Sequence, residues 1–189
     1  MNDISDRSVA PMPNPRSGQA DDRDTIIAPS SYWFEDFHVG QTLVTSARTI
    51  TAAELATFAG LTGDFMPIHM DAEFAARSEF GERIAHGLLG LVIAQGLIAL
   101  TGHIHESGLA SLSWNNWRFK LPIRIGDSVH VRLRIAALRD SASRPGAGIV
   151  TEQIDLINQD GQVTQTGEHI SLIRKRKVQP APDQIRPKV

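Results

Sequence analysis

A change in hydrophobic periodicity near residue 110 constrains the fold more than any other feature of this chain. Residues 83–102 carry apolar side chains almost all round a helical wheel, which predicts a long buried helix rather than a surface helix. After about residue 110 the period falls from 3.6 to 2 residues, as is typical of strands. The pattern predicts an α+β fold in which an antiparallel sheet wraps one long central helix.

Four segments carry the strand pattern after this helix. They run from Trp117 to Ile125, from Val129 to Ile135, from Ile149 to Ile157 and from Val163 to Ile173. The last two are separated by Asp160-Gly161, a dipeptide that favours hairpin turns. We therefore expect consecutive strands to pair in an antiparallel manner.

The region before the long helix contains a strand and two short helices. Residues 41–50 resemble a first strand. Thr51 and Glu54 form a capping box, which predicts a helix over 52–60. Asp71 is a suitable N-cap for a second helix over 72–78.

The two ends of the chain differ in composition from its centre. Residues 1–30 are rich in Pro, Ser, Asp and Arg and contain few large apolar side chains, so burial cannot offset the entropy of ordering them. We expect this segment to be disordered, and we expect residues 178–189 to form a flexible tail. The folded part is predicted to be one domain over residues 31–177.

Composition excludes several classes of function. The net charge is -2, so no overall field favours nucleic acid or an anionic membrane surface as a partner. There is no cysteine, which excludes disulfides, thiolate catalysis and cysteine-ligated metals, and which fits a cytoplasmic location. The longest apolar stretch is interrupted by glycines and is too short to span a bilayer, so we expect no membrane association.

An aspartate and a histidine lie five residues apart around a proline. Pro67 fixes its own φ and keeps Met66 out of the helical region, which stiffens the loop between Asp64 and His69. Two such groups can share proton transfers through one bound water if they reach the same point. By itself the spacing is a weak signal, because an aspartate before a proline often caps a turn and a single histidine is often structural.

The start of the long helix offers a complementary group. Hydration of a 2-enoyl thioester requires a base for water, an acid for the α-carbon and a donor for the enolate oxygen. Backbone N–H groups at a helix start point outward and favour negative charge. Gly87 leaves its N–H open to an acyl oxygen, whereas the neighbouring His86 could equally be a structural hydrogen-bonding residue.

Three sequence segments together resemble the MaoC-like dehydratases, a family that includes the (R)-specific enoyl-CoA hydratases. Residues 58–71, FAGLTGDFMPIHMD, are similar to a signature in which an aromatic and small residues precede G-D-x-N-P-[ILV]-H. Residues 84–87, IAHG, and residues 117–127, WRFKLPIRIGD, are similar to two further family segments. The resemblance covers most of residues 35–173.

The resemblance implies a single hot-dog domain that assembles as a homodimer, with two sheets joined edge to edge. It implies that Asp64 and His69 activate water, and that the N–H of Gly87 supports the thioester oxygen. It places four further residues beside the substrate: Phe65, Met66, Pro67 and His86. No metal and no cofactor is implied, because an acyl-CoA substrate brings its own coenzyme A.

The resemblance predicts a hydro-lyase that reversibly hydrates 2-enoyl-CoA to 3-hydroxyacyl-CoA. Met66 departs from the family pattern, since it replaces an asparagine and so removes a hydrogen-bonding side chain near the site. Two alternatives remain open at this stage. One is an acyl-CoA thioesterase, and the other is a non-catalytic subunit that binds acyl-thioesters.

Overall fold

A computed structural model describes residues 31–176, so the predictions for residues 1–30 and 178–189 lie outside the described range. The described chain forms one antiparallel sheet with helices beside it, which confirms the predicted α+β class. Its elements, in chain order, are η1 (Phe34–Asp36), β1 (Thr42–Val44), β2 (Arg48–Thr49), α1 (Ala52–Thr62), α2 (Pro67–Met70), α3 (Ala72–Ala76), α4 (Gly87–Leu100), β3 (Gly108–Phe119), β4 (Ser128–Asp140), β5 (Ala147–Ile157) and β6 (Val163–Arg174).

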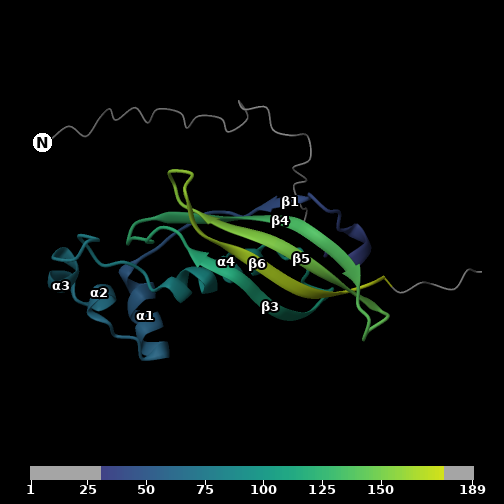
Figure 1. Ribbon diagram of the computed structural model, residues 1–189, viewed down its shortest axis with the longest axis horizontal. Helices are drawn as coiled ribbons and strands as arrows, with labels where there is room; N and C mark the ends of the chain where they lie inside the picture. Colours follow the sequence, from purple (N-terminus) through teal and green to yellow (C-terminus); the bar gives the residue numbers. More distant parts are fainter. Residues whose placement is uncertain (1–30, 177–189) are drawn as a thin grey trace, which may run out of the picture.

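The sheet has the strand order β1-β4-β5-β6-β3, and β2 pairs with β4 beside this path. Every pairing is antiparallel. The turn at Gly161, with φ of 74°, joins β5 to β6 as the Asp-Gly dipeptide predicts. Figure 1 shows α4 running behind the curved sheet, with α1, α2 and α3 beyond one end of it.

Helix α4 packs one face against the sheet and leaves the other open. Its inner residues join the core formed by β4, β5 and β6. On the opposite face Leu88, Val92 and Leu100 are 59%, 53% and 83% exposed. The expectation that α4 is buried all round is therefore wrong for the isolated chain, because the sheet covers only one side. None of the helices within residues 31–176 is long and apolar enough to cross a membrane.

Two predicted strands have different bounds in the structure. The strand expected over 41–50 is broken into β1 and β2, because the hydroxyl of Thr45 accepts a hydrogen bond from the N–H of Val131 and replaces a backbone partner. The strand expected from Trp117 to Ile125 begins earlier, at Gly108, and ends at Phe119. It ends there because the chain turns toward Pro122, which has no N–H to continue the ladder.

The carboxylate of Glu152 is buried in the sheet beside two histidines. Glu152 on β5 is 1% exposed, and its Oε2 lies 2.6 Å from Nδ1 of His169 on β6. His103 lies 3.7 Å from Oε1, too far for a hydrogen bond. Burial raises the pKa of Glu152, but the neighbouring His103 and His169 stabilise the ionised form more strongly, so the net pKa lies below its ordinary value.

Candidate active site

The loop between α1 and α2 carries the acidic residue of the candidate site. Helix α1 is capped by Thr51 and Glu54 as predicted, and it ends at Gly63, whose φ of 79° requires a residue without a side chain. Met66 is extended, with φ of -56° and ψ of 137°, and Pro67 then begins α2. The stiff loop expected from the sequence is thus a bend that leads directly into a short helix bearing His69.

The ring of His69 is held by a backbone carbonyl. Its Nδ1 lies 2.8 Å from the oxygen of Ile84, and a carbonyl oxygen only accepts, so Nδ1 carries a proton and donates. The neutral ring therefore has its lone pair on Nε2. Ile84 is itself fixed by a β-bridge to Arg124. This arrangement leaves a free basic nitrogen on a well-anchored imidazole.

The carboxylate of Asp64 lies close to this imidazole. Asp64 Oδ1 accepts a hydrogen bond of 3.3 Å from the N–H of Met66, which orients the side chain. Carboxylate and ring atoms of Asp64, His69 and His86 lie within 4.8 Å of one another. Such a spacing accommodates one water molecule hydrogen-bonded to both an acid and a base.

Gly87 brings a backbone N–H to the same place. It is the first residue of α4, where the N–H groups lack partners within the helix. A Cβ built on Gly87 would lie 2.9 Å from the ring of Phe119, so a larger residue would collide with this side chain of the cavity wall. The helix start thus presents an open N–H and the positive end of the helix dipole.

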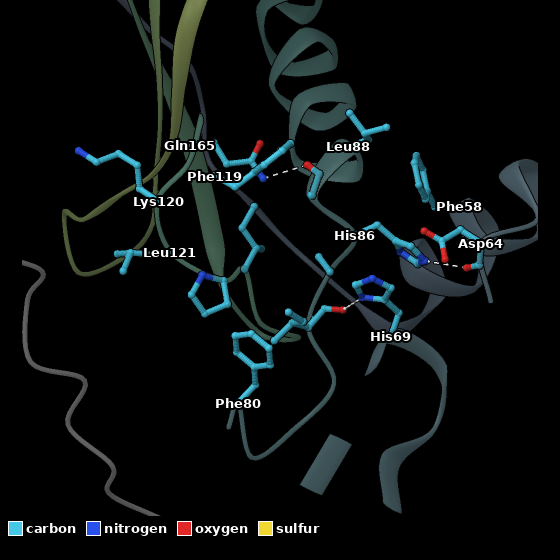
Figure 2. Close-up of a pocket in the computed structure, with 15 residues that line it drawn as sticks. Phe58, Asp64, His69, Phe80, His86, Leu88, Phe119, Lys120, Leu121 and Gln165 are labelled. Atoms are coloured by element: carbon cyan, nitrogen blue, oxygen red, sulfur yellow. Dashed lines mark hydrogen bonds between the residues drawn. The ribbon is translucent and has the colours of Figure 1, made fainter. Parts of the chain in front are cut away.

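A cavity of about 730 Å³ joins these groups (Figure 2). The carbonyl of Gly87 accepts a hydrogen bond of 3.0 Å from Gln165, whose own oxygen accepts one from Trp117. The rest of the lining is largely apolar, which suits the acyl part of a ligand. The lining residues are Phe58, Asp64, His69, Phe80, Ile84, Ala85, His86, Gly87, Leu88, Phe119, Lys120, Leu121, Pro122, Ile123 and Gln165.

The structure brings together four of the seven site residues predicted from sequence. Asp64, His69, His86 and Gly87 all line the cavity. The other three, Phe65, Met66 and Pro67, do not belong to its lining within the described chain and are exposed at the surface.

Sequence reasoning missed the apolar wall and the polar residue at its inner end. The sequence places Phe119 and Leu121 in a strand and in a family-like segment but gives them no role in the site, and it does not single out Gln165. Gln165 is 2% exposed and shares its strand face with the buried His169 and Ser171. Polar residues at alternate, inward positions of β6 are the signal that could have identified it.

Asp64, His69 and His86 are also the residues that could hold a metal ion. The rings of His69 and His86 lie against each other in a tilted arrangement, with centroids 3.9 Å apart and planes inclined by 31°. A metal site needs ligand atoms that converge on one point, and here Nδ1 of His69 and Nε2 of His86 are each already bonded to a backbone carbonyl.

Comparison with known proteins places these features in a family. The family model of the MaoC like domain matches residues 36–155 of this chain. The chain is 35% identical over 136 residues to the (R)-specific enoyl-CoA hydratase of Aeromonas caviae, covering 72% of this chain and 95% of that one. It is 39% identical over 107 residues to Protein MaoC of Klebsiella aerogenes, but this match covers 57% of the present chain and only 31% of that longer protein.

A solved structure agrees with the sequence comparison. The MaoC-like dehydratase from Rhodospirillum rubrum superposes with a TM-score of 0.70 at 30% identity, covering 78% of this chain and all of that one. The Asp64–His69 pair, the Gly87 amide and every residue of the cavity lining except Gln165 lie within the range matched by the family, residues 36–155. The chain therefore belongs to the MaoC-like family of hydro-lyases.

Proposed function

We propose that the protein reversibly hydrates 2-enoyl-CoA to 3-hydroxyacyl-CoA, using Asp64 and His69 as its acid–base pair. The observation that carries this proposal is the convergence of three groups on one cavity. A carboxylate oxygen of Asp64 and a ring nitrogen of His69 lie within 4.8 Å of each other, and Gly87 at the start of α4 lines the same cavity. The hydratase and dehydratase names of the relatives support the same reaction class.

The proton transfers follow from the hydrogen bonds of the site. Nε2 of His69 takes a proton from the bound water while the carboxylate of Asp64 orients that water. The water oxygen bonds to the β-carbon of the enoyl group, and the electron pair of the double bond moves to the α-carbon and the thioester oxygen. The acid–base pair then delivers a proton to the α-carbon, so the elements of one water molecule are added across the double bond.

Gly87 stabilises the charge that forms on the thioester oxygen. The enolate oxygen develops negative charge as the β-carbon is attacked, and a preorganised N–H at a helix start stabilises that charge. Removal of such a donor typically costs about 10²–10³ in kcat. The absence of a side chain at Gly87 is what allows the thioester to approach.

The cellular location, cofactor requirement and assembly expected from the sequence are part of the same proposal. We propose a cytoplasmic enzyme that needs no metal or redox cofactor. We also propose a homodimer joined through β3, which is an edge strand with only β6 as a neighbour in the sheet. Leu112 and Phe119 on β3 are 49% and 56% exposed, and such an apolar, unpaired edge favours association.

Turnover of crotonyl-CoA by the full chain tests the proposal. Loss of the enoyl absorbance without release of free thiol is the expected result, and the rate should survive prior treatment with EDTA. Release of thiol, measured with a chromogenic disulfide, would instead establish a thioesterase. Calorimetric binding of acyl-CoA with no conversion of short- or medium-chain enoyl-CoA would establish a binding subunit. Activity that disappears with EDTA and returns with Zn²⁺ would contradict the metal-free mechanism.

A further inference from the structure

His86 connects the two members of the proposed acid–base pair. It is 3% exposed and lies immediately before α4. Its Nε2 lies 2.9 Å from the backbone oxygen of Asp64, and a carbonyl oxygen only accepts, so the ring donates from Nε2. This bond ties the start of α4 to the loop that carries the carboxylate.

The same ring supports the imidazole of His69. The two ring centroids are 3.9 Å apart, and Phe58 contacts His86 at a centroid distance of 4.9 Å. Figure 2 shows His86 between Phe58 and His69. His69 is therefore held at one edge by the carbonyl of Ile84 and on one face by His86.

Neither nitrogen of His86 is free to act on a substrate. Nε2 is occupied by the carbonyl of Asp64. Nδ1 is buried, and within the described residues it has no hydrogen-bond partner. A group that binds substrate or transfers a proton must expose an available polar atom to the ligand, whereas one nitrogen of His86 is already bonded and the other is buried.

We propose that His86 is a positioning residue, which sets the separation of Asp64 and His69 through its hydrogen bond to the Asp64 carbonyl. This inference rests on the proposed hydratase function and replaces the direct substrate contact expected from the sequence. Loss of the bond frees the Asp64 loop, and a displacement of about 1 Å at a reacting group can cost about 10²-fold in rate. The effect falls on kcat, because the apolar wall that binds the acyl group does not depend on His86.

Two substitutions separate the hydrogen bond from the ring. His86→Gln places an amide N–H near the position of Nε2 and keeps the donor. His86→Phe keeps an aromatic ring between Phe58 and His69 and lacks the donor. We expect His86→Gln to stay within a few-fold of the wild-type kcat on crotonyl-CoA, and His86→Phe to lose about 10²-fold with little change in KM.

A loss confined to KM would overturn the proposal, because it would mean that His86 binds substrate. Equal loss in both variants would also overturn it, because the donor would then not be the cause. If His86→Phe does not fold, His86→Asn takes its place, since its shorter amide does not reach the Asp64 carbonyl. His103→Gln, at another buried histidine that does not line the cavity, is the matched control and should keep kcat.

Hydrogen–deuterium exchange gives a readout that does not depend on activity. Amides of residues 63–66 should exchange faster in His86→Phe than in the wild type or in His86→Gln, with other segments unchanged. Unchanged exchange in this loop would contradict the positioning role. If the wild type hydrates no enoyl-CoA, the proposed function fails, while the exchange experiment still decides whether His86 holds the loop.

Discussion

Gly90 on α4 is the position where one added methyl group should do most damage to the site. A Cβ built there would lie 2.6 Å from Cδ of Gln165 and closer still to its Nε2. Gln165 cannot move freely, because it donates to the carbonyl of Gly87 and accepts from Nε1 of Trp117. Gly90→Ala must therefore displace a buried amide, break both bonds, or shift α4 away from β6.

The expected loss of stability follows from these contacts. Replacing a helical glycine by alanine gains up to about 1 kcal/mol in helix propensity. Two broken hydrogen bonds cost about 1 kcal/mol each, and the overpacked methyl costs about 1–3 kcal/mol more. We expect Gly90→Ala to destabilise the fold by about 2–4 kcal/mol, which lowers Tm by about 5–15 °C in a domain of this size.

Urea unfolding followed by circular dichroism and tryptophan fluorescence measures this effect. Gly60→Ala in α1 is the matched control, because a Cβ there meets no atom within 4 Å. It should leave stability unchanged or raise it by up to about 1 kcal/mol. A Gly90→Ala variant as stable as the wild type would refute the close packing of Gln165 against α4.

Three further predictions concern other parts of the molecule. Asp64→Asn and His69→Ala should each lower kcat on crotonyl-CoA by at least about 10²-fold, measured by loss of enoyl absorbance. Met66→Asn supplies a favourable N-cap to α2, where Met66 makes no side-chain cap bond, and should stabilise by about 0.5–1 kcal/mol in thermal melts. Because the pKa of Glu152 is lowered in the folded state, its carboxylate stabilises the fold above about pH 4.5, and this contribution is lost as acid protonates it. The free energy of unfolding in urea should therefore fall less between about pH 5 and pH 3 in Glu152→Gln than in the wild type.

Local rules of sequence account for much of the fold. The capping box at Thr51 and Glu54, the Asp71 cap of α3 and the Asp-Gly turn before β6 all act over a few residues, and each is present in the structure. The strand β4 could also be predicted from its alternating apolar residues, because each of these side chains faces the core: Val129, Val131, Leu133 and Ile135.

Features that depend on distant contacts could not be predicted in this way. The break between β1 and β2 depends on the bond between Thr45 and Val131, which are 86 residues apart. The exposed face of α4 depends on where the sheet stops, although its sequence is apolar all round. A helical wheel reports which residues avoid water but not which other chain or element covers them.

The candidate site likewise combines features that follow from nearby residues with features that depend on distant contacts. Asp64 and His69 could be paired from sequence because Pro67 keeps the intervening chain short and stiff. The tautomer of His69 and the burial of His86 could not be predicted from the sequence. They depend on hydrogen bonds to the backbone carbonyls of Ile84 and Asp64, which exist only in the folded chain. Gln165 reaches the site from 78 residues away, through a bond that no local pattern specifies.

The central claim is that Asp64 and His69 act together on a single bound water. The kcat/KM of Asp64→Asn, His69→Ala and the double variant on crotonyl-CoA tests it most directly. If the two groups form one catalytic unit, the double variant should be about as slow as the slower single variant. Losses that multiply, or near-wild-type turnover by either single variant, would show that the two residues do not serve the same proton transfer.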